Sequence, residues 1–282
     1  MPRECTPEGS HVQRTLLNCS PPKHISASKG GYSARSGVLA NEVISETSAL
    51  AQSADRYPQV ASPIHTIVVL AALGAWTYWG RVLAAQLSAA VNPNRVHFYV
   101  ATILFEWLLF VLVVADVLRK GASVLIVLGD RWHSIRQVLR DIGIAVGFWI
   151  VASVVLWIFG RLLRIAALGH NMQFMLPHRG AELTSWITLS VTAGICEETI
   201  FRGYLQRQFM ALTKSASGGI LLSAAAFGAA HAYQGFRMVI LIGLYGTMFG
   251  ILAYWRGTVR PGMIAHAWQD SLNGVLASVM RH

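Results

Sequence analysis

Two adjacent carboxylates lie at the end of a long apolar run in this chain. Glu197 and Glu198 follow the apolar segment 186–196 directly. One acidic side chain at the centre of a bilayer costs about 2.5–3.5 kcal/mol even on permissive insertion scales. Ionisable groups in such a position are therefore a functional-site hypothesis by default. This pair is the first candidate for chemistry.

The spacing gives the two carboxylates different surroundings. Residues four apart share one face of a helix, and a glutamate that precedes its cation has the favourable orientation. Glu198 is therefore expected to pair with Arg202. Glu197 lies about 100° further round the helix and lacks a local cation, which makes it the candidate general base. A salt-bridged helix end at the membrane surface is the alternative interpretation.

Two later apolar segments carry polar groups at the same spacing. His231 comes four residues after Phe227, and His266 comes four residues before Asp270. A helix presents both members of such a pair on one face. A lone histidine on an apolar helix is more often a hydrogen-bonded core group than a catalyst. Three segments that each deliver such groups are harder to explain by structure alone, and small neighbouring residues would let the helices approach closely.

These residue types together suit hydrolysis by an activated water. A carboxylate and an imidazole can hold and deprotonate water, and a second imidazole with a polar neighbour can stabilise the resulting oxyanion. The G-x-S-x-G and H-E-x-x-H strings are absent, so neither a serine nucleophile elbow nor a soluble zinc-protease helix is indicated. Glu197, His231 and His266 would still make a three-ligand zinc set with an open fourth position. Zinc is therefore possible, and metal use stays open.

The composition is that of a membrane protein. Of the 282 residues, 54% are hydrophobic and 13% are charged, whereas soluble domains contain about 25% charged residues. The formal net charge of +10 comes from Lys and Arg placed between apolar runs, which is typical of membrane topology. We therefore expect a lipid bilayer and a membrane-associated peptide or protein substrate as partners, and no nucleic acid.

The hydrophobic pattern predicts an all-α, multi-pass transmembrane helix bundle of seven or eight spans. Residues 1–60 are polar and are expected to form a disordered tail; 61–180 are expected to hold the N-terminal transmembrane helices and a basic loop, and 181–280 the catalytic core. The expected spans cover residues 64–79 (with an extension to about 91), 98–118, 142–160, 183–210, 220–233, 238–255 and 262–279.

Charge between the spans predicts the orientation. Lys and Arg are more frequent on the side that holds the N-terminus and the Glu197 end of its span, and the positive-inside rule makes that side cytoplasmic. We expect an integral protein of a bacterial inner membrane with its site toward the cytoplasm. Glu106, inside the second span, is interpreted as a structural polar contact, with membership of the active site as the alternative.

Three motifs, around Glu197, His231 and His266 in that order along the chain, resemble the CAAX-protease and bacteriocin-processing (CPBP, or Abi) family of intramembrane endopeptidases. The resemblance covers about residues 181–280. It implies an all-helical fold, a polar cavity reached from the cytoplasm and from lipid, and endopeptidase activity, which in eukaryotic members acts on prenylated CAAX tails. The motifs are Glu197-Glu198-x-x-Phe201-Arg202-Gly203-x-Leu205, Phe227-x-x-x-His231 and His266-x-x-x-Asp270.

The resemblance also implies roles for these positions. Glu197 would activate the water with help from His231, and Glu198 with Arg202 would support it. His266 and the residue at 270 would hold the oxyanion. The family position at 270 can be Asn, which donates a hydrogen bond. Asp270 donates only when protonated, and otherwise it would orient His266.

Two other classes of function use the same residue types. A noncatalytic membrane scaffold or bacteriocin-immunity protein would bind a peptide in the same cavity. An ion- or proton-coupled transporter would use buried acids and histidines as a relay, although inverted repeats and broken helices are not evident in the sequence.

Overall fold

The computed structural model describes residues 56–90, 93–164, 174–178 and 180–280. The chain divides into two units, Met1–Ser48 and Ala49–His282, and every described residue belongs to the second. The predicted disordered tail, residues 1–60, therefore lies outside the described residues except for 56–60.

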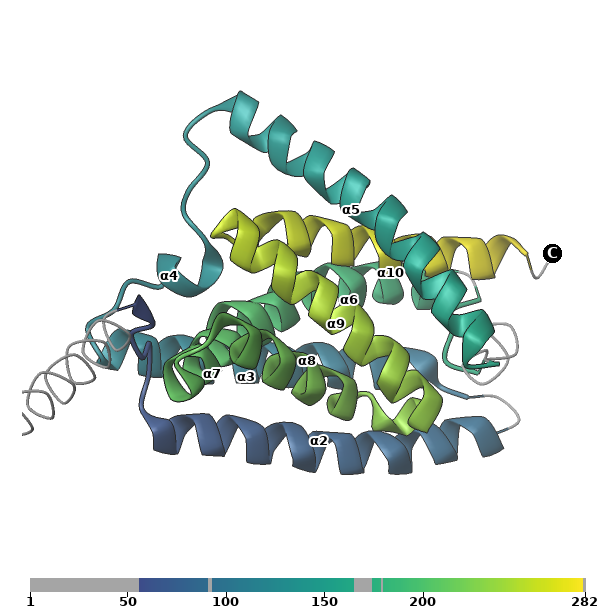
Figure 1. The fold of residues 1–282 in the computed structure, drawn as a ribbon. Coiled ribbons are helices and arrows are strands. Elements are labelled where there is room, and N and C mark those ends of the chain that lie inside the picture. The colour runs from purple at the N-terminus through teal and green to yellow at the C-terminus, as the bar shows by residue number, and fades with distance from the viewer. Residues whose placement is uncertain (1–55, 91–92, 165–173, 179, 281–282) are drawn as a thin grey trace, which may run out of the picture. The chain divides into compact units, whose positions relative to one another are not determined.

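The described residues form helices and their connections, and they contain no strand, which confirms the predicted all-α fold (Figure 1). One segment is a π-helix, η1, and a short one is a 3₁₀ helix, η2. In chain order the elements are α2 (Pro63–Ala89), α3 (Arg95–Arg119), α4 (Leu125–Leu128), α5 (Ile135–Leu162), α6 (Ala181–Glu197), η1 (Glu198–Leu205), α7 (Gln206–Thr213), α8 (Ala216–Ala230), η2 (Ala232–Gln234), α9 (Phe236–Arg256) and α10 (Arg260–Val279).

Four of these helices are long and apolar enough to cross a membrane: α2, α3, α5 and α9. A further helix, α8, is apolar but shorter. The multi-pass bundle is thus supported, whereas the count of seven or eight spans stays a prediction for α6, α8 and α10. The basic connection between α3 and α5 contains only the four-residue α4, so its apolar stretch is too short to span, as expected.

Local sequence signals set several helix ends. The side chains of Ser62, Asn94, Ser134 and Ser215 each accept a hydrogen bond from a backbone N–H in the first turn of the helix that follows. These caps satisfy donors that the first turn otherwise leaves without partners. Helix α9 ends before Gly257, whose left-handed conformation (φ 66°) favours glycine.

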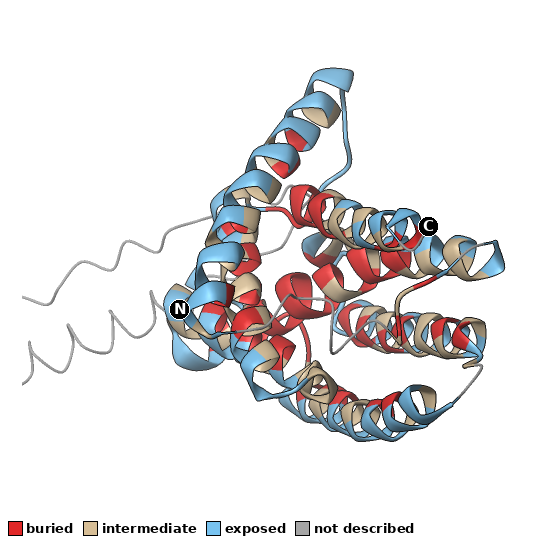
Figure 2. Cartoon of the chain, turned by 90° about the vertical axis from the view of Figure 1, so that its right-hand side faces the viewer, coloured by how far each residue is buried: buried red, intermediate tan, exposed pale blue. Residues whose placement is uncertain are grey.

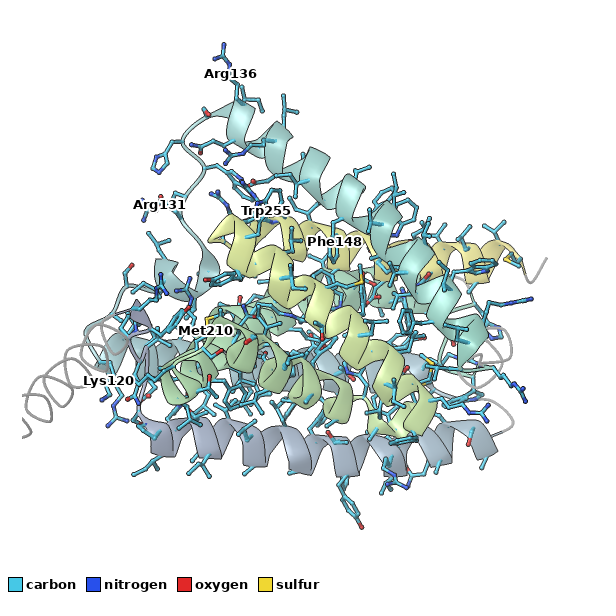
Figure 3. All side chains as sticks on the ribbon, viewed as in Figure 1. Lys120, Arg131, Arg136, Phe148, Met210 and Trp255 are labelled. Atoms are coloured by element: carbon cyan, nitrogen blue, oxygen red, sulfur yellow. The ribbon has the colours of Figure 1, made fainter. Side chains whose placement is uncertain are left out.

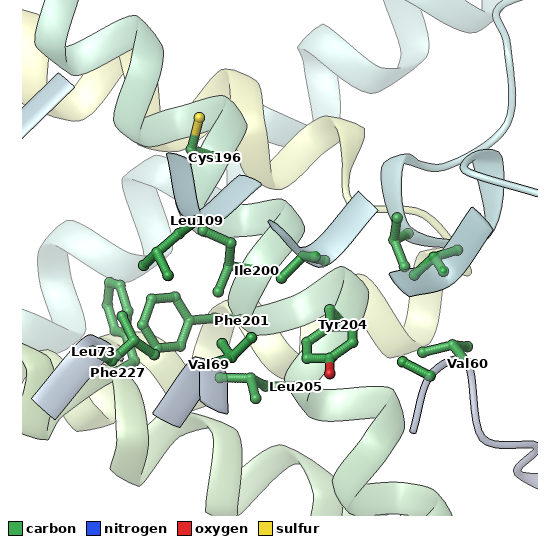
Figure 4. Packing of buried hydrophobic residues seen from close by; sticks show 14 residues of the cluster. Val60, Val69, Leu73, Leu109, Cys196, Ile200, Phe201, Tyr204, Leu205 and Phe227 are labelled. Atoms are coloured by element: carbon green, nitrogen blue, oxygen red, sulfur yellow. The ribbon is translucent and has the colours of Figure 1, made fainter. Parts of the chain in front are cut away.

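The main core lies around η1. Phe201, Tyr204 and Leu205 are almost fully buried and pack with Leu109 of α3 and Phe227 of α8 (Figure 4). Buried residues follow the inward faces of the helices, whereas the outward faces are exposed (Figure 2). Large apolar side chains occupy those outward faces on α2, α3 and α5, as expected where lipid surrounds a helix.

Candidate functional site

The candidate site is built on one long helical rod. Helix α6 ends at Glu197, the π-helix η1 begins at Glu198, and α7 continues from Gln206. All eight residues of η1 are buried. π-Helical turns are rare, and they occur frequently at functional sites. The sequence pattern predicted a helix here, but not that its hydrogen-bond register changes between the two adjacent glutamates.

The π-helix η1 packs closely against α4, in the connection between α3 and α5. Gly203 has no Cβ, and a Cβ at this position would overlap the backbone carbonyl of Val127 in α4. On the adjacent turn, the Thr199 hydroxyl donates to the carbonyl of Ile195 at 2.7 Å. The π-helix is therefore packed against the α4 backbone at Gly203, and the hydroxyl of Thr199 bonds to a backbone carbonyl of the turn before it.

Glu198 and Arg202 form the predicted ion pair. Arg202 Nη1 lies 2.9 Å from Glu198 Oε1, and both side chains are 1% exposed. The guanidinium lies over the ring of Phe227, with its Cζ 4.2 Å from the centroid, and near that of Phe249 at 4.9 Å. A buried pair of this kind is weak evidence for stability, because desolvation offsets much of the attraction. It does fix the position of the Glu198 carboxylate.

His266 of α10 lies near both adjacent carboxylates, Glu197 and Glu198. Its Nδ1 lies 3.0 Å from Glu198 Oε1, so Nδ1–H can donate to that carboxylate. Its Nε2 faces the other way, 3.7 Å from Glu197 Oε2 and 3.6 Å from Asp270 Oδ2. Both distances exceed direct hydrogen-bond range, which leaves Nε2 and the two carboxylates able to contact one shared ligand. The three carboxylates therefore converge on a single imidazole.

Small residues allow α10 to approach the rod this closely. A Cβ on Gly262 would lie 3.0 Å from Glu198 Oε2, and one on Gly194 would lie 2.7 Å from the carbonyl oxygen of Met263. The indole N–H of Trp186 also donates to the backbone carbonyl of Asp270 at 2.8 Å. Helix α10 is therefore held against α6 at both ends of the site.

His231 is placed differently from the other candidates. It caps the end of α8, and its Nδ1 lies 2.8 Å from the carbonyl oxygen of Phe227. The Phe227 ring packs edge-on against both imidazoles, 4.8 Å from His231 and 6.2 Å from His266 between ring centroids. Among the described residues, no nitrogen of His231 lies within 4.0 Å of a carboxylate oxygen. His231 is therefore connected to the other candidates by its contacts with Phe227 and not by an ion pair.

Two further buried groups border the cluster. Glu106 of α3 and Tyr245 of α9 each have a side-chain oxygen without a hydrogen-bond partner in the described part of the chain. The charge of Glu106 interacts with those of Glu197 and Asp270. Glu106 was interpreted as a structural contact, with the active site as the alternative, and both interpretations stay predictions. Nothing in the apolar sequence around Tyr245 singles it out.

The geometry does not supply a metal site. Within the described ranges, no three His, Cys, Asp or Glu side chains lie close enough together to hold an ion. Of the proposed zinc ligands, Glu197 and His266 approach within 3.7 Å of each other, whereas His231 has no nitrogen within 4.0 Å of a carboxylate oxygen in the described part of the chain. The donor set therefore does not fit zinc in this conformation.

Comparison with known proteins bears on this segment. Residues 179–272 match the family model described as type II CAAX prenyl endopeptidase Rce1-like. The resemblance to the CPBP family is confirmed. The match covers roughly a third of the chain and includes all six candidate residues. At the level of the family it indicates a CAAX-type membrane endopeptidase. Searches of curated proteins and of solved structures found no match.

Proposed function

We propose that this protein is an intramembrane endopeptidase that hydrolyses a peptide bond of a membrane-associated protein or peptide with a water activated by Glu197. The observation that carries the proposal is the convergence of Glu197 and Asp270 on Nε2 of His266, within 3.7 Å, inside the segment that matches the CPBP family. CAAX-type processing is the substrate class that the family suggests.

In the proposed mechanism Glu197 is the general base. It accepts a proton from the water, whose oxygen attacks the carbonyl carbon of the scissile bond. The C–N bond then breaks, and Glu197 returns the proton to the leaving nitrogen, which gives a carboxylic acid and an amine; the acid then passes its remaining proton to the amine or to water. His231 assists by orienting the water through Nε2, since its Nδ1 is engaged by the Phe227 carbonyl.

His266 is proposed to hold the oxyanion. Because Nδ1–H donates to Glu198, a second proton on Nε2 is needed to donate to the substrate oxygen. The carboxylates of Glu197 and Asp270 lie on that side and stabilise the positive charge. Arg202 acts through Glu198, and it fixes the carboxylate that positions His266. Asp270 is proposed to orient His266.

The decisive experiment measures cleavage by purified protein in lipid nanodiscs. The substrate is a peptide with a prenylated cysteine near its carboxyl end, and products are identified by mass spectrometry. Glu197→Gln should lower kcat by about 10²-fold or more, because Gln cannot accept the proton. Asp130→Asn is the control, because it neutralises a carboxylate at an exposed position, and it should cleave at nearly the wild-type rate.

Three results separate this proposal from its alternatives. Equal turnover by Glu197→Gln and wild type would refute the mechanism. Cellular function retained by an inactive Glu197→Gln variant would favour the noncatalytic peptide-binding protein. Loss of activity in a chelator, with recovery on addition of zinc, would support a metalloendopeptidase whose ligands assemble only in another conformation.

A further inference from the structure

A cavity lies between α4, α7 and the link from α9 to α10. Its volume is about 240 Å³, several times the roughly 30 Å³ that a water molecule occupies. Arg56, Gln206, Arg207 and Thr258 line it together with apolar side chains such as Met210. The cavity thus combines cationic and apolar walls.

Two positive charges in this cavity lack a negative partner. Arg207 is half-buried and forms no hydrogen bond or ion pair with the part of the chain described here, and Arg56 forms no ion pair there either. Arg202 also borders the cavity, but Glu198 already neutralises it. No acidic side chain is among the described residues that line the cavity. A partly desolvated guanidinium without a counterion is costly, so the site is complementary to an anion.

The cavity lies at the level where lipid headgroups are expected. Exposed aromatic side chains gather at this end of the bundle: Trp132, Tyr254 and Trp255 are 45%, 52% and 67% exposed. Tyrosine and tryptophan at such positions mark the membrane–water interface. Lys120 and Arg131 lie at the same end (Figure 3). A ligand here would place an anionic group beside Arg207 and its acyl chains along the apolar helix faces.

We propose that this cavity binds the phosphate of an anionic lipid headgroup, with Arg207 as the principal contact and Arg56 as the second. The planar guanidinium matches phosphate with paired hydrogen bonds, and basic pockets between membrane helices on the cytoplasmic side are suited to such headgroups. Because α7 continues directly from η1, the bound lipid would brace the rod that carries the catalytic carboxylates. The proposal does not depend on the protease activity.

The test is native mass spectrometry of the full chain in detergent, titrated with phosphatidylglycerol or phosphatidylcholine. Wild type should bind phosphatidylglycerol with a Kd at least about tenfold lower, because the choline of phosphatidylcholine offsets its phosphate charge whereas phosphatidylglycerol keeps a net negative charge. Arg207→Gln should remove most of that preference, and Arg56→Gln should reduce it. Arg119→Gln removes the same charge from an exposed position at the end of α3, and it should leave the preference unchanged.

Other outcomes would overturn the proposal. Equal affinity of wild type for the two lipids would exclude headgroup recognition. An equal loss in Arg119→Gln and Arg207→Gln would indicate general attraction to the basic surface. Glycerol 3-phosphate that binds as tightly as phosphatidylglycerol and displaces it would assign the site to a free phosphate ester. If Arg207→Gln fails to fold, an unchanged preference in Arg56→Gln refutes the two-arginine site.

Discussion

At the scale of single residues, His266 is the point where the site's charges meet. One ring nitrogen contacts Glu198, and the other faces Glu197 and Asp270. An imidazole in this position is held by its surroundings before a substrate arrives. Such preorganisation of a donor is the largest contribution to catalysis in many enzymes. The proposed role of Asp270 is to fix the orientation of this ring.

That role predicts how position 270 tolerates substitution. Asp270→Asn should keep activity within about tenfold of wild type, because the amide keeps a polar group beside His266 and can donate to the oxyanion. Asp270→Ala should lower kcat by roughly 10²-fold, since it removes one of the two carboxylates that face Nε2 of His266. Steady-state kcat and KM on the nanodisc substrate would test both. An Asp270→Asn variant as inactive as Asp270→Ala would contradict the orienting role.

At the scale of elements, the π-helix η1 depends on the absence of one side chain. Gly203→Ala would push a methyl group into the Val127 carbonyl, which must displace either α4 or the rod. We expect a loss of stability of about 1–3 kcal/mol and a lower kcat, because Glu197 and Glu198 lie on the same rod. Thermal unfolding and turnover would measure the two effects.

The control for this prediction lies on α5. A Cβ at Gly147 meets no atom within 4 Å, so Gly147→Ala should leave activity unchanged and stability equal or slightly higher. Equal destabilisation by the two substitutions would show that the Val127 contact is not the cause.

The buried carboxylate of Asp141 connects α5 to the end of α9 and the start of α10. Asp141 is fully buried and lies 3.3 Å from Arg256, 3.2 Å from Arg260 and 2.9 Å from the indole nitrogen of Trp132. Asp141→Asn would leave two largely buried guanidinium groups without a charge partner. Removing one partner from such a network costs about 3–5 kcal/mol.

The expected result for Asp141→Asn is a lower unfolding temperature and faster proteolysis of the segment between α4 and α5. Asp130→Asn is a close control, since Asp130 is exposed and, within the described part of the chain, pairs with His133 alone. It should behave as wild type in both measurements. A similar effect of the two variants would contradict the anchoring role of Asp141.

At the scale of the whole molecule, the distribution of charge predicts the orientation of the helices across the membrane. Basic side chains such as Lys120 and Arg131 lie at the end where α3 and α9 finish (Figure 3). The positive-inside rule predicts that this end is cytoplasmic. The cavity with Arg207 and the start of α10, which carries His266, belong to the same end.

Cysteine labelling in oriented vesicles would test this orientation. In a background with Cys5→Ser and Cys19→Ser, Lys120→Cys should react with an impermeant maleimide only from the cytoplasmic side. Ser88→Cys, exposed near the far end of α2, should react only from the other side. Cys196 is buried and should stay unlabelled. The reverse pattern would place the candidate site toward the opposite compartment.

The sequence by itself determined which segments are helical, and it indicated which residues are candidates for chemistry. Apolar runs interrupted by charged links identify membrane helices, and the four-residue spacing of Glu198 with Arg202 and of His266 with Asp270 places each pair on one face. These signals are local, so they can be read without knowing how the helices pack. The Glu198–Arg202 ion pair was predicted in this way and is present.

Only the tertiary structure decided how the motifs meet. Spacing cannot show that His266 contacts Glu198 and merely faces Glu197, or that Phe227 packs against both His231 and His266. Nor can it predict the π-helical register of η1 or the cavity beside Arg207. Each of these depends on contacts between residues far apart in the chain, and close packing of small side chains such as Gly194, Gly203 and Gly262 sets those contacts.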